Sequence, residues 1–471
     1  MKNTQLVVIL RSMDISEFKE LGKYVISPYF NNRSEVIRFY DALKKHYPLF
    51  DSDEFTDKII FDIVYPGKSF SDVLMRKLVS LTTNLVLDFI AVKGFRNDSI
   101  GYNILLIDKL SERGLVEMFQ KRSRILNEHL DSSKHDFAYY QSRLRQTSLL
   151  NGYFLNTDEK SMIKGYQKEL DDLMQFFFSG VLLMYVRLTE WSRTLNHKFN
   201  LTFFNEVVNH FSLLKTDNIT LATLYYNMLM LIKTDEEKYY DDLINSSEQF
   251  RPNLSDADAY NTAIVLIQYC HKKVLKGNSE FRYKQFEITK GILKDNIIPP
   301  GFIEPYFFTN IIRNATAIQE CDWAENFLYE YRHKLKPEIA TEICDYSFAM
   351  IEITRGNFER SLTHLSKINI ERSNMKLDIK NLQIVIYYEL NYAEELISLT
   401  DAFKHYLRRE KTLPELSVQN NLKFLGFVSD LVKVSQNKNS KTAYLLNKQI
   451  SESEYFGSKE WLLRKSEDLM K

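Results

Sequence analysis

Glycine and proline are scarce in this chain, which has 14 of the first and 9 of the second among its 471 residues. Average usage of about 7% and about 5% would give roughly twice as many of each. Both residues punctuate sheets and turns, whereas long stretches here show apolar residues recurring every three and four positions. The scarcity and the spacing together predict an all-α protein whose helices are joined by short connections.

The length indicates more than one core, because 471 residues exceed the roughly 250 to 300 residues at which a single core stops growing. Hydrophobic residues at 44% and charged residues at 26% are ordinary for a folded soluble protein. We expect a small N-terminal helical domain over 1–95, a long-helix bundle or connecting region over 96–217, and a helical-repeat array over 218–471.

The charge balance offers no attraction for nucleic acid or an anionic membrane, since 62 basic residues match 62 acidic residues. No stretch approaches 18 apolar residues, so no membrane insertion is expected. The three cysteines, Cys270, Cys321 and Cys344, are odd in number and widely spaced. This pattern favours buried free thiols in a reducing compartment, and the cytoplasm is therefore the expected location.

Two segments are apolar around most of a helical circumference. The first is opened by a capping Ser71, runs through Lys93 and should be the central helix of the N-terminal core. The second spans about 160–196 and includes Phe176, Phe177, Phe178 and Trp191. Because little polar face is left on it, we expect this helix to be buried on several sides.

The strongest pattern is a recurring turn between two amphipathic helices. It occurs at Cys321-Asp322-Trp323, Gly356-Asn357-Phe358 and Leu390-Asn391-Tyr392, whose aromatic residues lie 35 and 34 residues apart. A looser continuation upstream uses Tyr239 and Phe281, with a spacing of 42 residues. A period of this size predicts stacked helix pairs.

These pairs resemble the tetratricopeptide repeat, in a degenerate form and best over residues 302–406. In that family the glycine closes the turn, the aromatic residue packs between the helices, and a small residue three positions later admits close approach; here these are Gly356, Phe358 and Ser361. The other two copies replace the glycine with Cys321 and Leu390. The resemblance implies an α-solenoid whose concave surface binds a protein or peptide. An irregular α-hairpin solenoid of another class is the alternative.

Six polar residues on the first helices of two repeats are the candidate partner-binding groove. They are Asn310, Arg313 and Asn314, followed by Lys376, Lys380 and Asn381. Within each group the spacing of three to five residues restricts the side chains to part of the helix surface. Family members that grip carboxylates use Lys, Asn and Arg on these helices, although their positional pattern is not reproduced here. An ordinary solvated face is the simpler interpretation.

Catalytic and metal-binding motifs were not found in the sequence. The segment Gly67-Lys68-Ser69 imitates the end of a phosphate-binding loop, but that motif needs glycine at 62, where this chain has Asp62. The nine histidines are scattered singly. We therefore expect no enzyme activity, no cofactor and no metal, and predict a non-enzymatic protein-protein interaction or scaffold protein.

A DNA-binding transcriptional regulator is the alternative function. Residues 55–93 are similar in rhythm to the winged-helix module of bacterial activators that carry a helical-repeat sensor domain. A helix that enters the major groove should present several basic or amide side chains. Between Ser71 and Phe89 only Arg76 and Lys77 are basic, and these would be the nucleic-acid contacts. A core helix is the favoured interpretation of this segment.

Overall fold

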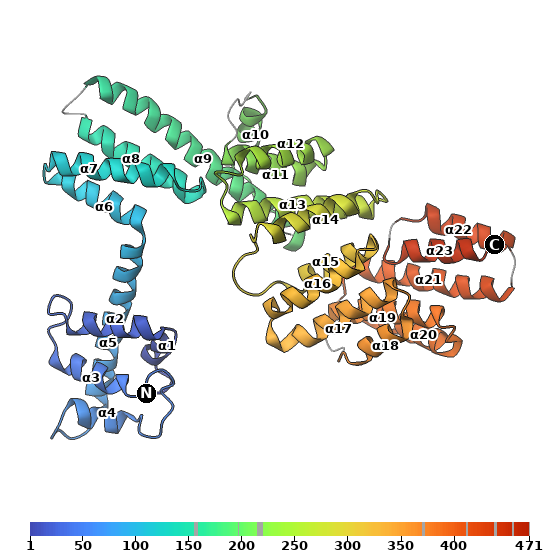
Figure 1. Cartoon of the computed structure of the whole chain (residues 1–471), viewed down its shortest axis with the longest axis horizontal. Helices are drawn as coiled ribbons and strands as arrows, with labels where there is room; N and C mark the ends of the chain where they lie inside the picture. Colours follow the sequence, from blue (N-terminus) through green and yellow to red (C-terminus); the bar gives the residue numbers. More distant parts are fainter. Residues whose placement is uncertain are drawn as a thin grey trace. The chain divides into compact units, whose positions relative to one another are not determined.

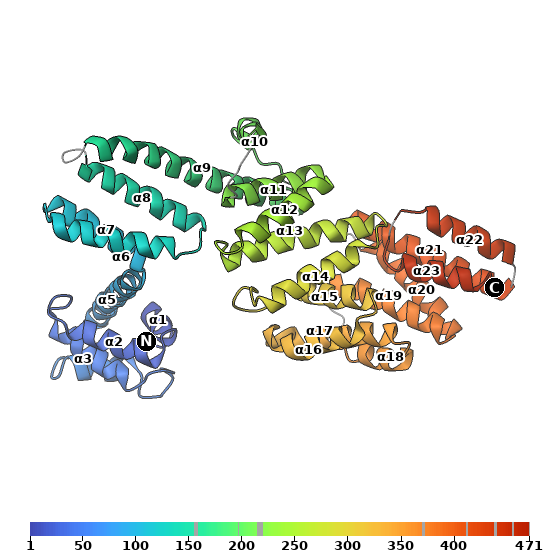
Figure 2. The same ribbon diagram turned by 45° about the horizontal axis from the view of Figure 1, so that its top comes forward.

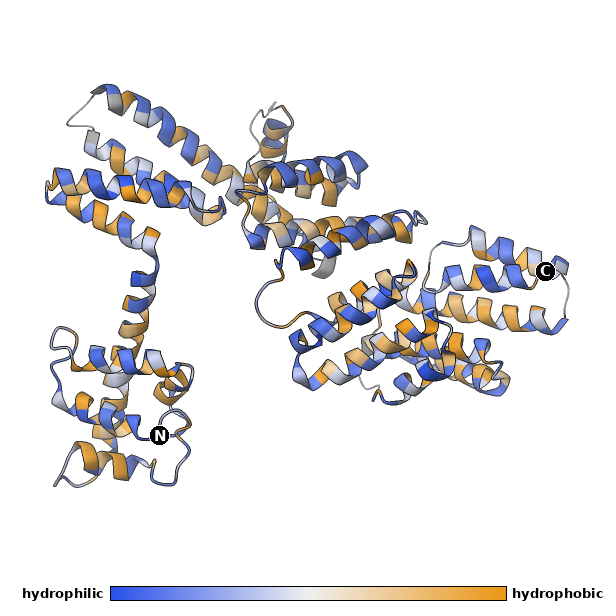
Figure 3. Ribbon diagram, in the orientation of Figure 1, coloured by the Kyte–Doolittle hydropathy of each residue, from blue (hydrophilic) through white to orange (hydrophobic). Residues whose placement is uncertain are grey.

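The computed structural model describes residues 1–154, 159–195, 197–213, 220–369, 373–410, 413–437, 440–454 and 456–470. Throughout these ranges the regular structure is helical and no residue lies in a strand (Figure 1). Most helices carry both hydrophobic and hydrophilic residues along their length, as amphipathic helices do (Figure 3). The prediction of an all-α protein is confirmed.

The chain divides into two compact units. One consists of Met1–Ser133 with Ala138–Leu173, and the other of Lys134–Phe137 with Met174–Lys471. The division expected from the sequence, into 1–95, 96–217 and 218–471, stays a prediction. Helix α5 runs through its first boundary, and the boundary between the two units falls within helix α9.

The first unit contains eight helices and the start of a ninth within the described residues. They are α1 (Gln5–Arg11), α2 (Ile15–Ile26), α3 (Ser34–Lys44), α4 (Asp57–Val64), α5 (Asp72–Asn97), α6 (Ser99–Glu112), α7 (Val116–Asp131), α8 (Phe137–Phe154) and α9 (Glu159–Leu195).

Helix α5 is the central helix of the N-terminal core, as the sequence predicts. The Ser71 hydroxyl accepts a hydrogen bond from the Leu74 N–H and caps the helix, which packs against α1, α2 and α3. Met75, Leu78 and Val86 are almost fully buried. Helix α5 is also long and apolar enough to span a membrane by length and composition alone, a criterion that core helices of soluble proteins meet as well.

Helix α9 differs from expectation. Its apolar side chains were expected to be buried on several sides, but Ile163, Leu170, Phe177 and Trp191 are between 45% and 62% exposed. Leu182 and Val186 in the second half of α9 are buried as expected, so the prediction fails only in part, because periodicity counts apolar residues without identifying their neighbours. Ile163 and Leu170 lie on the part of α9 that packs on α8. There Thr147 hydrogen-bonds to Asp172 and Phe137 stacks on Phe176, so one neighbouring helix covers only one side of α9.

The second unit continues with helices that pack one after another along the chain. They are α10 (Phe204–Leu213), α11 (Leu221–Thr234), α12 (Glu237–Phe250), α13 (Asp256–Leu275), α14 (Phe281–Lys294), α15 (Pro305–Ala317), α16 (Cys321–Tyr331), α17 (Pro337–Thr354), α18 (Phe358–Ser366), α19 (Ser373–Glu389), α20 (Ala393–Arg409), α21 (Glu415–Asn437), α22 (Ser440–Glu452) and α23 (Lys459–Asp468), with a short 3₁₀ turn at Arg332–Lys334.

The turn at Gly356 has the structure that its residues predict. Gly356 has φ +79°, its N–H donates to the Ile353 carbonyl, and the Asn357 N–H donates to the Glu352 carbonyl. This is the Schellman closure that favours glycine. Ser361 is fully buried, and its hydroxyl donates to the Ala349 carbonyl of the preceding helix, so a small residue is needed there.

The other two turns close in the same way around residues other than glycine. Gln319 and Asn391 take the left-handed conformation, with φ +67° and +58°. The turn expected at Cys321-Asp322-Trp323 therefore lies earlier, because these three residues already form the first turn of α16. An asparagine tolerates this backbone conformation better than most side chains, whereas a glutamine gives no sequence signal for it.

Candidate partner-binding surface

Arg313 joins the first helices of three successive pairs. From α15 its guanidinium Nη2 donates to the Tyr346 hydroxyl of α17 at 3.0 Å and to Asp378 Oδ2 of α19 at 2.9 Å. We call Arg313, Tyr346 and Asp378 the polar row. Arg313 and Asp378 keep 40% and 42% of their side chains exposed, so solvent and ligands can reach both charges.

Tyr346 is the buried member of the polar row. It is 3% exposed, and burial, together with the Asp378 carboxylate, raises the pKa of its hydroxyl to about 12 while Arg313 opposes that shift. The hydroxyl is therefore neutral at physiological pH and accepts the hydrogen bond from Arg313. Because the Tyr346 ring is buried, its hydroxyl has a fixed position. The hydrogen bond to this hydroxyl therefore holds the Arg313 guanidinium beside α17 and within reach of Asp378 on α19.

A separation of 33 residues recurs among the hydrogen bonds between helices of this unit. Arg313 and Tyr346 are 33 residues apart. The same separation joins Arg355 to Asp322, Tyr392 to Glu359 and Tyr225 to Asp258 through hydrogen bonds. Other contacts in this unit have different separations, such as 30 residues for Cys270 and Tyr240 and 44 for Arg251 and Asp295.

His271 of α13 and Arg282 of α14 are electrostatically linked to the polar row. Desolvation and then the charges of Arg313 and Arg282 lower the pKa of His271, although the residue is exposed at the surface. Arg282 of α14 donates to Glu460 Oε1 of α23 at 2.8 Å. The surface therefore carries two arginines and a histidine, and each arginine is matched by a carboxylate.

The predicted residues on α15 have different roles in the structure. Asn314 is buried at 7% exposure, and its Nδ2 donates to the Arg282 carbonyl at 3.1 Å, so it joins α15 to α14. Asn310 is half-buried and makes no side-chain hydrogen bond within the described residues. Only Arg313, of these three, contributes a charge to the surface.

The predicted residues on α19 lie on two sides of that helix. Lys376 and Lys380 each stand two residues from Asp378, which is about 200° around the helix. They lie over rings of α20, with Lys376 Nζ 4.5 Å from the Tyr406 ring centre and Lys380 Nζ 5.6 Å from that of Phe403. Desolvation and then the charge of Lys376 lower the pKa of Lys380.

Asn381 forms a separate link to the next helix. Its Nδ2 donates to Asn421 Oδ1 of α21 at 2.7 Å, while its own Oδ1 is buried without a hydrogen-bond partner among the described residues. The six predicted residues are thus not brought together into one groove. Tyr346, Asp378, His271 and Arg282 were missed, and only the recurrence of positions about 33 residues from Arg313 could have identified Tyr346.

The C-terminal helix α23 packs at the end of α19. Glu389 accepts hydrogen bonds from Trp461 Nε1 and Lys465 Nζ, each at 2.7 Å. The Trp461 ring also packs against Tyr388. Figure 2 shows α21, α22 and α23 side by side, with α23 against both of the others. Helix α23 therefore occupies part of the surface that α19 and α21 would otherwise expose.

Arg76 and Lys77, the alternative nucleic-acid contacts, lie on α5. Arg76 forms an ion pair with Asp72 one turn earlier, and Lys77 is exposed. Residues 55–93, all of which are described, contain helix and connecting segments and no strand, so they form no wing hairpin.

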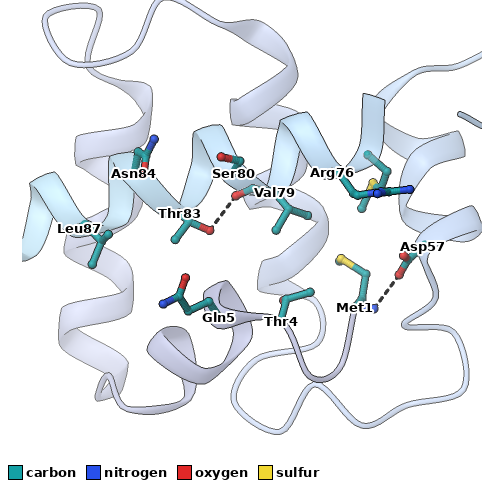
Figure 4. Close-up of a pocket in the computed structure, with 11 residues that line it drawn as sticks. Met1, Thr4, Gln5, Asp57, Arg76, Val79, Ser80, Thr83, Asn84 and Leu87 are labelled. Carbon is teal, nitrogen blue, oxygen red and sulfur yellow. Dashed lines mark hydrogen bonds and ion pairs between the residues drawn. The ribbon is translucent and has the colours of Figure 1, made fainter. Parts of the chain in front are cut away.

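A small cavity of about 300 Å³ lies beside the same helix. Figure 4 shows Thr4 and Gln5 from the N-terminal segment facing Val79, Thr83 and Leu87 of α5 across it. Arg76 borders this cavity but is paired with Asp72, so its charge is already partly compensated.

Chemically reactive groups are few in the described part of the chain. No group of three or more His, Cys, Asp and Glu side chains there could hold a metal ion. Cys270, Cys321 and Cys344 are unbridged. Burial raises the pKa of all three thiols, to about 11 for Cys270, so they stay protonated and poorly nucleophilic at neutral pH.

No family model, no curated protein and no solved structure matches this chain.

Proposed function

We propose that this protein is a non-enzymatic interaction or scaffold protein of the cytoplasm. In this proposal the helix pairs from about residue 218 onward form a tetratricopeptide-like α-solenoid, and the surface around the polar row binds a protein or peptide partner. The observation that carries the proposal is the polar row itself. Arg313, Tyr346 and Asp378 come from successive first helices, about 33 residues apart, and two of them remain accessible.

Stacked helix pairs of this size support the proposal physically. A single pair cannot bury its apolar face alone, and stacking leaves one continuous surface formed by the first helices. Charged side chains on such a surface give specificity when a partner offers complementary groups. Arg313 can rotate from Asp378 to an incoming carboxylate, and Asp378 can accept from an incoming cation, so the pair suits a partner segment that carries both charges.

The test is recovery of a partner from the native cell extract with a tagged full-length chain. The informative variant is Arg313→Gln with Asp378→Asn, which removes both charges of the polar row and leaves the net charge unchanged. The control is Arg355→Gln with Asp322→Asn, a pair that is also 33 residues apart but joins the C-cap of α17 to the first turn of α16, where Arg355 contacts Glu325 and Glu352 as well.

We expect a partner that co-purifies with the wild type and the control variant and is reduced at least about tenfold with the polar-row variant. Circular dichroism melts establish that both variants fold. Equal recovery with both variants would show that the polar row is not the binding surface. Loss with both variants, at unchanged melting temperature, would assign binding to another part of the unit.

A further inference from the structure

Helices α12 and α14 border an open groove whose floor is α13. Figure 2 shows α13 between the other two, and α13 packs against both. The groove has a volume of about 780 Å³. Its lining runs from Tyr240 to Arg251 on α12 and from Tyr283 to Asp295 on α14. At about 1.5 Å per residue this is roughly 16 to 18 Å, or three helical turns.

The floor and inner walls of the groove are mainly apolar, with Thr262 and Ser247 as their polar members. Ala259, Ala263 and Leu266, at spacings of four and three residues, form the floor. Ile244 and Ile288 from the two walls are only half-buried, and Tyr283 at the mouth is 61% exposed. A Cβ added to Gly291 would meet nothing within 4 Å, so this glycine leaves part of the groove open.

The rim of the groove is acidic. It carries four carboxylates, Asp241, Glu248, Glu287 and Asp295, but only two cations, Arg251 and Lys284. Both cations already have partners on the protein, because Arg251 pairs with Asp295 at 3.1 Å and Lys284 with Glu237 at 3.8 Å. Glu287 is paired with Lys290.

Asp241 and Glu248 are the two rim carboxylates that remain without an ion-pair partner among the described residues. Both are exposed, and neither forms an ion pair within the described residues. They stand seven residues apart on α12, which places them on the same side of the helix about 10 Å from each other. An elongated apolar groove with two unpaired negative charges at helical spacing is complementary to a helix with an apolar face and basic flanks.

We propose that the groove between α12 and α14 binds an amphipathic helix of a partner protein, with its apolar face on α13 and basic side chains seven residues apart facing Asp241 and Glu248. The length of the groove favours a helix over a compact small molecule, and its negative rim repels nucleic acid. This site is separate from the polar row, so either can fail without the other.

The probe is a fluorescein-labelled helical peptide of about 15 residues, with leucines recurring at three and four positions and lysines seven residues apart beside them. Its binding to the full-length chain is measured by fluorescence anisotropy at low and at physiological salt. A second peptide replaces each lysine with glutamate, and a third has the same composition in an order that destroys the apolar face.

Two variants of the groove test its two features. Gly291→Leu fills the open space from a helical position, where leucine is also a better helix former than glycine. Asp241→Lys with Glu248→Lys reverses the rim charge at exposed, unpaired positions. The matched control is Glu394→Lys with Asp401→Lys, two exposed carboxylates seven residues apart on α20. Each variant is compared with the wild type by thermal melting first.

We expect the lysine peptide to bind the wild type and the control variant equally within about twofold, and Gly291→Leu at least about tenfold more weakly. The charge-reversed variant should lose about tenfold for the lysine peptide and gain affinity for the glutamate peptide. Equal binding of the three peptides, or a lysine peptide insensitive to Gly291→Leu, would overturn the proposal. A dimer in sedimentation velocity that Gly291→Leu dissociates would instead assign the groove to a second copy of this chain.

Discussion

The polar row and the α12–α14 groove belong to the same unit, but their charges are arranged in opposite ways. In the polar row Arg313 contacts both Tyr346 and Asp378, so each charge has a partner within the chain. In the groove, Asp241 and Glu248 have none among the described residues, and the surface between the walls is mainly apolar. A ligand at the polar row must compete with an existing ion pair, whereas a ligand at the groove supplies the missing charge.

Replacing Asn314 with alanine should destabilise the protein by about 1 to 2 kcal/mol, because a buried side chain and the hydrogen bond by which it joins α15 to α14 are both lost. Urea unfolding measures the change. Asn310→Ala on the same helix is the control and should stay within about 0.5 kcal/mol, since Asn310 is half-buried and donates no hydrogen bond to the described chain. If both substitutions lower the free energy of unfolding equally, the packing of α15 on α14 does not depend on Asn314.

Replacing Gly291 with alanine should stabilise the protein by about 0.5 to 1 kcal/mol, because the helix gains a better former and the added Cβ meets open space. The same change at Gly356 should destabilise it by roughly 1 kcal/mol, since φ there is +79°. Paired thermal melts compare the two. A destabilising Gly291→Ala would mean that the groove is closed in solution.

Arg313 and Asp378 should show a coupling energy of about 0.5 kcal/mol in a double-mutant cycle of Arg313→Gln and Asp378→Asn. The value is small because both side chains are about two-fifths exposed and are screened by solvent. The coupling should decrease further in about 1 M salt, where the Debye length is about 3 Å. A coupling that is independent of salt would show that the hydrogen bond, rather than the charge, holds the pair.

His271 should titrate below its ordinary pKa of about 6.5, because desolvation and the charges of Arg313 and Arg282 disfavour its protonation. The folded pKa is lower than the unfolded one, so stability from neutral His271 is present above about pH 6.5 and is lost as the pH falls through the folded value. Nuclear magnetic resonance measures the pKa. Arg313→Gln should raise it, and Arg360→Gln, an exposed control on α18, should not.

How far the sequence predicts the fold is clearest at the three turns. Gly356 identifies its own turn because only a residue without a Cβ adopts φ +79° easily, and Ser361 follows as the small residue that close packing needs. Gln319 and Asn391 form the same closure, but glutamine has no preference for that conformation. The turn before α16 was therefore placed too late.

The candidate surface was predictable only in part. The helical spacing of Lys376, Lys380 and Asn381 did not show which side of α19 each residue occupies. In the structure the two lysines point away from Asp378 and toward α20. Asp378 was missed because an acidic residue beside two lysines resembles an ordinary solvated face. The groove had no sequence signal, since its walls are two helices that are distant in the chain.

The sequence by itself determined that this protein is built of helices, because the scarcity of glycine and proline and the three-and-four spacing act on each segment independently of the rest. It also determined the central position of α5 and the closure at Gly356. Only the tertiary structure decided which apolar side chains are buried by other helices. Helices α5 and α9 are both apolar by sequence, yet each buries only some of its apolar side chains. On α5, Leu78 and Val86 are buried, whereas Val73 and Leu87 are 72% and 48% exposed. On α9, Leu182 and Val186 are buried, whereas Ile163 and Trp191 are exposed. Burial depends on the atoms that surround a side chain, and these come from segments that periodicity does not relate.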